Sequence, residues 1–171
     1  MSDREIYFQE AERFVAGTVG EPGERAFYLQ VRGNKRLLTM SIEKSQVAAL
    51  AQRVAILIRE IRISQPLIAI SLQPIDNAPL EAPIDEEFVV GEIGISFDDQ
   101  KSVIEIELVE LTENDAEDPV VVTVALTLGQ ADSFAKRSNS LVAAGRVACP
   151  FCGGPVNKSG HLCPRANGYR R

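Results

Sequence analysis

The chain is poor in the residues on which catalysis and extracellular stability most often depend. Its 171 residues include no tryptophan, one histidine and only three cysteines. No run reaches the roughly eighteen apolar residues of a membrane-spanning helix, and the opening Met-Ser-Asp-Arg-Glu lacks the basic and apolar parts of a signal peptide. The cysteine count leaves no disulfide framework of the secreted kind. These absences predict a cytoplasmic protein with one ordinary hydrophobic core.

The three cysteines and the histidine all fall near the C-terminal end of the sequence. They form the spacing C-x2-C-x8-H-x-C, made by Cys149-Pro-Phe-Cys152 and His161-Leu-Cys163. Zinc prefers a tetrahedral shell of thiolate and imidazole ligands, and a Cys₃His set fills all four positions, so that no site is left for a substrate water. The sequence therefore predicts a structural zinc site with Cys149, Cys152, His161 and Cys163 as its ligands.

Neighbouring residues suit such a site. Gly153 and Gly154 follow the second cysteine, where a positive φ turns backbone amides toward the sulfurs. Lys158 and Arg165 offer further donors. Two alternatives remain open: a redox dithiol, which thioredoxin-like proteins place between a strand and a helix, and a set of unrelated free thiols. A catalytic zinc is disfavoured because it needs an open position.

Charge divides the chain into an acidic body and a basic end. The sequence holds 18 basic and 24 acidic residues, but from Ser133 onward seven are basic and none is acidic, so the preceding residues carry a net charge of −13. An acidic body argues against general nucleic-acid binding, whereas a basic zinc tail could bind nucleic acid through Arg165, Arg170 and Arg171. The opposite charges also predict that the tail docks on the body.

Hydrophobic periodicity predicts an α+β fold made of two antiparallel strand-strand-strand-helix units and a C-terminal zinc knuckle. The body spans 1–146, and its halves, about 1–63 and 84–146, are joined by a proline-rich crossing at 64–83; the basic zinc-binding tail is 147–171. Within the crossing, 67–72 is apolar enough for a short strand or a buried strap. We expect a short strand, or a strand with a break, at 6–18, and further strands near 27–31, 38–42, 89–97, 104–108 and 120–126. Gly33 and Asn34 should form the two-residue turn between the strands at 27–31 and 38–42. Helices are expected over 43–62 and from 127 to the glycine at 145.

The two predicted helices share a register. Each carries a glutamine followed four positions later by a large apolar residue, then an alanine, and an arginine two positions after the alanine. This similarity suggests an internal duplication, whose two sheets would meet about a pseudo-twofold axis. The matching residues are Gln46, Leu50, Ala51 and Arg53 in the first helix and Gln130, Phe134, Ala135 and Arg137 in the second.

Other patterns give no clear catalytic centre. The glycines at 17, 20 and 23 lie before a strand and not before a helix, which favours a hairpin loop over a phosphate-binding loop, although a ligand site beside Arg25 stays open. Carboxylates gather at 85–87, 98–99 and 115–118, where charge runs are typical of solvated turns. We therefore expect no catalysis. A concave pocket near Arg25 or near the acidic turns would favour the alternative of a small-ligand binder or an enzyme.

The tail and the early loop resemble a known family. The motifs are Cys149-Pro-Phe-Cys152-Gly, Gly160-His-Leu-Cys-Pro-Arg165 with the ending Asn167-Gly-Tyr-Arg-Arg171, and the early Gly20-Glu-Pro-Gly-Glu-Arg-Ala-Phe-Tyr-Leu-Gln30. They are similar to an uncharacterised bacterial family, the domain of unknown function 3090, over nearly the whole chain. The resemblance implies no activity. Its members often neighbour genes for a histidine-phosphatase-like and a lipid-kinase-like protein, which implies a partner role near phosphate chemistry.

Together these features predict a non-catalytic interaction or scaffold module, braced by structural zinc, with a protein partner of unknown identity. Two alternatives are a nucleic-acid-binding adaptor that uses the basic zinc tail and an unfamiliar small-ligand-binding protein or enzyme linked to phosphate metabolism.

Overall fold

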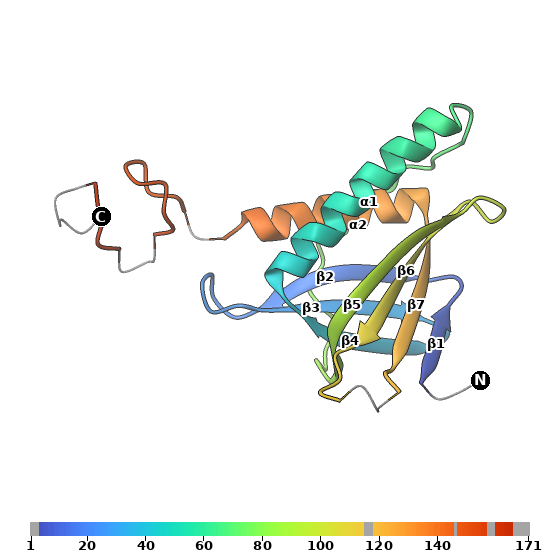
Figure 1. Ribbon diagram of the computed structural model, residues 1–171, viewed down its shortest axis with the longest axis horizontal. Helices are drawn as coiled ribbons and strands as arrows, with labels where there is room; N and C mark the ends of the chain where they lie inside the picture. Colours follow the sequence, from blue (N-terminus) through green and yellow to red (C-terminus); the bar gives the residue numbers. More distant parts are fainter. Residues whose placement is uncertain (1–3, 115–117, 146, 157–159, 166–171) are drawn as a thin grey trace.

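The computed structural model describes residues 4–114, 118–145, 147–156 and 160–165. These form a mixed seven-stranded sheet in the order β1-β7-β6-β5-β4-β3-β2, together with two helices, so the predicted α+β class is confirmed. In Figure 1, β2 to β4 run across the view, β5 to β7 cross them steeply, and both helices lie over the strands. The elements are β1 (Glu5–Phe8), β2 (Arg13–Val19), β3 (Ala26–Gly33), β4 (Arg36–Ile42), α1 (Lys44–Ser64), β5 (Glu86–Asp98), β6 (Val103–Glu110), β7 (Val121–Thr127) and α2 (Leu128–Ala143).

The first unit is the expected antiparallel meander followed by a helix. Phe27, Leu29 and Val31 alternate along β3 and are buried, as period-2 patterning predicts. The turn between β3 and β4 lies one residue later than expected, because Gly33 still pairs with Arg36 and the two intervening residues, Asn34 and Lys35, take positive φ. On α1 the buried residues recur every three or four positions, as the helical period requires; they are Val47, Leu50, Ala51, Val54, Ile58 and Ile61.

The glycine-containing loop is a hairpin connection, as expected. It joins β2 to β3, and Gly20 and Gly23 adopt φ of 104° and 99°, which side chains rarely allow. Gly17 lies inside β2, where an added Cβ would collide with the side chain of Leu80. These glycines therefore serve turn geometry and close packing.

Each helix begins with a capping box whose glutamine also reaches the other unit. Gln46 accepts a hydrogen bond from the backbone N–H of Glu43 through Oε1 and donates through Nε2 to the carbonyls of Val90 and Gly91 at the start of the second unit. Gln130 likewise accepts from Thr127 N–H and donates to the carbonyl of Ala11, just before β2. The two units are thus joined by equivalent contacts, which supports the duplication, although the duplication itself stays a prediction.

The opening segment differs from the predicted plan. Its break at 9–12 separates two strands, and β1 crosses to the second unit, where Glu5 to Phe8 pair in parallel with Val121 to Val124 of β7. Across β7, the hydroxyl of Tyr7 donates a hydrogen bond to the carboxylate of Glu105 on β6. The second unit therefore has four strands, one of them borrowed from the N-terminal end.

The crossing at 65–85 contains no strand, so of the two alternatives for 67–72 the short strand is wrong and the segment is a strap, only partly buried. Ile68 and Ile70 pack against the core, but Leu67 is 98% exposed. The chain passes close over α2, where an added Cβ on Gly129 would collide with the carbonyl oxygen of Ser71. Ser133 then donates a hydrogen bond to the carbonyl of Pro74. The segment is a strap held by contacts to its backbone.

Polar side chains from β2, β3 and α2 hold the second half of the strap. Arg13 donates two hydrogen bonds to the Asp76 carboxylate, at 2.6 and 3.1 Å. Arg137 donates to the backbone carbonyls of Asp76 and Ala78, at 2.6 and 2.7 Å, and to that of Ala16 on β2. Both guanidinium-bearing side chains are only 11% exposed. Asp76 is therefore the shared counter-charge of two largely buried cations.

We expect Asp76→Asn to destabilise the protein by about 1–3 kcal/mol, because two charged donors lose an ionised acceptor. Hydrogen bonding by Arg13 is the main cause that lowers the pKa of Asp76 below its usual 3.8, with Arg137 contributing. The stabilisation is present above about pH 4 and lost as the pH falls below that value, because the carboxylate must be ionised to give it. Urea unfolding at pH 7 and pH 3 measures the effect.

The difference between wild type and Asp76→Asn should shrink at pH 3. Asp99→Asn, which changes an exposed turn carboxylate, is the matched control and should unfold like wild type at both pH values. A loss of stability in Asp76→Asn that is the same at both pH values would contradict the role of the charge.

Tyr7 gives a second, spectroscopic prediction. The hydrogen bond to Glu105, burial and the charges of Glu105 and Asp98 raise the pKa of Tyr7 to about 12. The neutral phenol makes this bond, so its stabilisation is present below pH 10 and is lost as the pH rises toward 12. Ultraviolet titration of tyrosinate should show a late ionisation that is absent in Tyr7→Phe.

Glu105→Gln should move that ionisation toward pH 10, because it removes both the acceptor charge and its repulsion of tyrosinate. Glu107→Gln is the control: Glu107 is exposed on the same strand and faces Thr123. An unchanged late ionisation in Glu105→Gln would show that Glu105 is not its cause.

Candidate metal centre

After α2 the chain forms a small hairpin that carries the first two cysteines. Ala148 pairs with Pro155 in an isolated antiparallel bridge, and backbone hydrogen bonds join Val156 N–H to Val147 and Cys149 N–H to Gly154. Gly153 closes the turn at φ 71° by donating to the Cys149 carbonyl. Gly154 does not take positive φ, so only one of the two glycines behaves as predicted.

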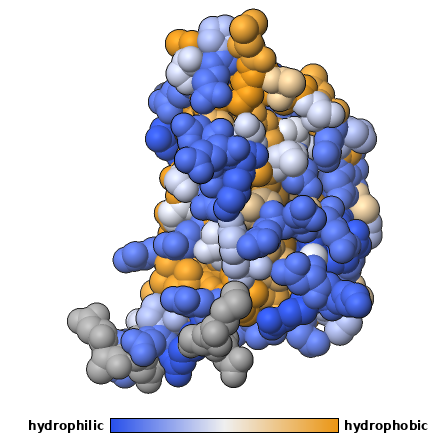
Figure 2. All heavy atoms as spheres, turned by 90° about the vertical axis from the view of Figure 1, so that its right-hand side faces the viewer, coloured by the Kyte–Doolittle hydropathy of each residue, from blue (hydrophilic) through white to orange (hydrophobic). Residues whose placement is uncertain are grey.

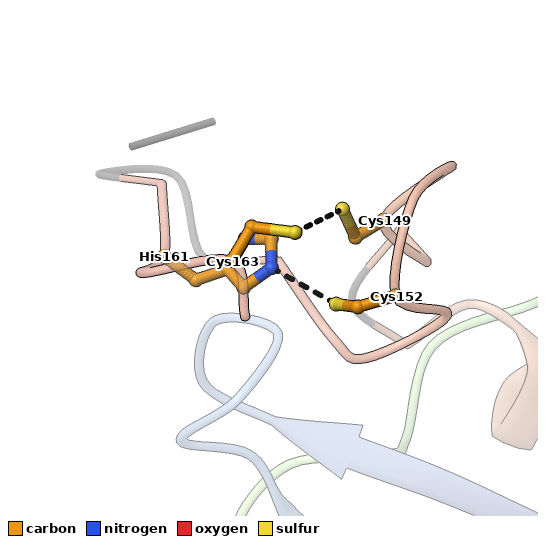
Figure 3. Close-up of side chains that lie close together, drawn as sticks. All are labelled: Cys149, Cys152, His161 and Cys163. Atoms are coloured by element: carbon orange, nitrogen blue, oxygen red, sulfur yellow. Dashed lines mark hydrogen bonds between the residues drawn. The ribbon is translucent and has the colours of Figure 1, made fainter. Parts of the chain in front are cut away.

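All four predicted ligands converge (Figure 3). The Sγ atoms of Cys149 and Cys163 are 3.8 Å apart, and Cys152 Sγ lies 3.3 Å from His161 Nε2. One donor atom from each residue fits within 4.8 Å of the other three, so the cluster could hold a metal ion. A tetrahedral shell with metal–sulfur bonds of about 2.3 Å has sulfur–sulfur edges of about 3.8 Å, which the cysteine pair already has.

The surroundings of the sulfurs differ within the cluster. Hydrogen bonds from the backbone N–H groups of Cys152 and Phe151 lower the pKa of the Cys149 thiol, against the effect of burial. The N–H of Gly154 acts in the same direction on Cys152, but burial and the nearby Cys163 and Cys149 outweigh it and raise the pKa of that thiol. Once one of these sulfurs is ionised it opposes the ionisation of the next, and a cation among them removes that repulsion.

His161 is oriented by its contact with Cys152. Its Nε2 faces Cys152, whereas its Nδ1 is buried and has no hydrogen-bond partner among the described residues. Cys149 and Cys163 are almost fully buried although they belong to a tail of a few short turns. The donor set therefore fits a closed four-ligand site.

The other predicted donors are placed differently. Arg165 donates from Nη1 to the carbonyl of Phe151 at 3.4 Å and thus braces the first loop. Lys158 and the arginines at 170 and 171 lie outside the described residues. Figure 1 places the described tail beyond the end of α2. Docking of the tail on the body through its charge stays a prediction.

A hollow of about 350 Å³ lies beside Arg25, as the small-ligand alternative requires. Arg25 and Lys44 supply its cations, and Gly145 lies on its wall. Arg25 Nη2 also donates to the Leu141 carbonyl of α2, and Lys44 Nζ lies beside Gly145, just after the helix, where an added Cβ would be 3.1 Å from it. Cations at the end of a helix stabilise its exposed carbonyls.

Of the carboxylate groups, 98–99 lies at the β5–β6 turn, 86–87 begins β5, and 115–117 falls outside the described residues.

No helix in the described part of the chain is long and apolar enough to cross a membrane.

Comparison with known proteins identifies a family. A family model described as a protein of unknown function (DUF3090) matches residues 6–163, which includes the body and all four candidate ligands. No curated protein and no solved structure matches the chain.

Proposed function

The chain belongs to the DUF3090 family, a family of unknown function, and we propose that it is a non-catalytic interaction module whose C-terminal knuckle is folded by structural zinc. The observation that carries the proposal is the convergence of three sulfurs and one imidazole within 4.8 Å. Four protein donors complete a tetrahedral shell, so the ion would brace the tail and not act on a substrate.

The geometry favours zinc over the redox alternative. A redox dithiol needs two cysteines at the start of a helix, whereas Cys149 and Cys152 lie in a hairpin turn and share their site with His161 and Cys163. Mixed sulfur and nitrogen donors in this number suit Zn²⁺ better than Mg²⁺ or Ca²⁺, which prefer oxygen. Three reduced cysteines also suit the cytoplasm, where we place the protein.

The interaction role is supported by apolar side chains that the fold leaves uncovered. Ile63, in the last turn of α1, is 74% exposed, and Leu67, just beyond it, is 98% exposed. Figure 2 shows an apolar surface at the top of the molecule, the level at which α1 ends in Figure 1. Exposed apolar surface of this kind is typical of contact with another protein. We call Ile63 and Leu67 the α1-end patch.

A small anionic ligand in the hollow beside Arg25 is the second candidate. The hollow has the concave shape and the positive charge that such a ligand needs. We rank it below the interaction role because Arg25 already donates to α2 and Glu43 adds a negative charge to the wall.

We expect one zinc ion per chain by elemental analysis of protein purified without added metal. Metal binding to structural Cys/His sites in small peptides releases about 10–16 kcal/mol, far more than a tail without a core can gain by packing. Cys152→Ser or a chelator should therefore raise hydrogen exchange at 147–156 and 160–165, while exchange in β3, β4 and α1 stays unchanged.

The control is a serine substitution at an exposed position beside the cluster, Ala148→Ser, which keeps all four donors and should keep the metal. Zinc-free protein, or loss of protection throughout the chain in Cys152→Ser, would contradict a brace confined to the tail.

The α1-end patch should bind a partner. Leu67→Glu should remove proteins that co-purify with the wild-type chain from the native cytoplasm, because it places a charge in an apolar contact. Gln52→Glu, at an exposed position on α1 away from the patch, should leave them bound. The thermal unfolding temperatures of both variants should equal that of wild type. The same co-purifying proteins in Leu67→Glu and wild type would contradict the patch.

A further inference from the structure

The knuckle exposes apolar side chains beside the candidate ligands. Phe151 precedes Cys152 and is 43% exposed, and Leu162 lies between His161 and Cys163 and is 70% exposed. The ligand atoms of the two loops converge within 4.8 Å, so both loops flank the same point. An aromatic ring and a leucine exposed on so small a unit are costly in water and are typical of a contact surface.

Positive charge accompanies this apolar surface. Arg165 is exposed, and its Nη1 lies 3.4 Å from the Phe151 carbonyl oxygen, so the guanidinium is held at the loop that carries the ring. The sequence from Ser133 to the end contains seven basic and no acidic residues. A ligand of this surface therefore combines negative charge with flat apolar faces.

We propose that the knuckle surface made by Phe151, Leu162 and Arg165 binds single-stranded nucleic acid. Proteins that bind single strands combine cations that follow the phosphates with aromatic side chains on which bases stack. A duplex hides its base faces, so it would offer only phosphates to this surface. An acidic peptide would satisfy Arg165 but offers no flat base to stack on the exposed part of the Phe151 ring.

This inference rests on the proposed zinc site, because only a folded knuckle holds Phe151 and Arg165 together. The acidic body opposes binding through long-range repulsion. At physiological ionic strength charges are screened over about 8 Å, and Figure 1 shows the knuckle beyond the end of α2 and apart from the sheet. The body should thus weaken the interaction and restrict it to the knuckle without abolishing it.

The test is fluorescence anisotropy of the full-length, zinc-loaded chain with a labelled oligouridylate of about ten nucleotides. Phe151→Ala should weaken binding by roughly tenfold or more, since a stacked base contributes about 1–3 kcal/mol, whereas Phe151→Trp should retain it. Arg165→Ala should reduce the slope of log affinity against log salt by about 0.7, the value for one phosphate contact on a single strand.

Matched controls lie on the body. Leu72→Ala removes a leucine of similar exposure, 62% against 70% for Leu162, and Arg59→Ala an exposed arginine of α1, and neither should change the affinity. The zinc content of each variant is measured alongside. If Phe151→Ala loses zinc, Leu162→Ala takes its place, and it should retain zinc and weaken binding.

Three results would overturn the proposal: no binding by the zinc-loaded chain at about 50 mM salt, equal binding by wild type and the Phe151 and Leu162 variants, or equal binding to a duplex or to polyglutamate. If the chain still contains one zinc ion in any of these cases, the proposal of a structural metal site stands and only the nucleic-acid proposal fails. A chain that binds no zinc overturns both the metal site and this inference.

Discussion

The parallel pairing of β4 with β5 is the constraint on which the architecture of the body depends. Parallel neighbours cannot be joined by a tight turn, so the chain must travel back over the molecule between them. Here α1 makes the outward path, and the strap at 65–85 makes the return. Since the strap has no ladder of its own, its backbone groups need partners from side chains. Arg13, Gln30 and Arg137 are such partners, and they tie the strap to β2, β3 and α2.

Gln30 shows why local sequence patterns predict the core face of the sheet better than the face that the strap covers. The alternation of Phe27, Leu29 and Val31 predicts β3 and its core face correctly, and the same period places Gln30 on the opposite face of a half-buried strand. The structure buries Gln30, whose amide pairs with both the N–H and the carbonyl of Glu81. A strap more than fifty positions away leaves no periodic trace in β3. For the same reason the sequence did not reveal that β1 pairs with β7 or that Arg13 and Arg137 meet at Asp76. The helices and most strands were predictable because the hydrophobic periodicity that indicates them lies within each segment itself.

The tail was predictable for a different reason. Its four candidate ligands lie close in sequence, so their spacing alone limits how they can meet, and the structure brings all four together. The side chains between the ligands carry no such signal, and the exposure of Phe151 and Leu162 depends on how each loop turns around the site. Gly154 illustrates the limit: its position suggested positive φ, but the turn closes at Gly153 alone.

Each unit has an antiparallel set of strands, a helix and a glutamine that contacts the other unit, yet the outer faces of the two units differ. In the first unit the segment after the helix wraps the sheet, and Leu80 fills the space above Gly17. In the second unit the segment after α2 forms the knuckle, and the outer face keeps a hollow of about 610 Å³ beside Tyr7, Val103 and Ala125. The paired arginines follow the same division: Arg137 is enclosed against the strap, whereas its counterpart Arg53 is exposed and faces Glu60 at 3.9 Å. The units therefore differ in the segment that follows each helix. The strap after α1 covers the outer face of the first unit. The segment after α2 leaves the outer face of the second unit open and carries the cysteine and histidine cluster away from the body.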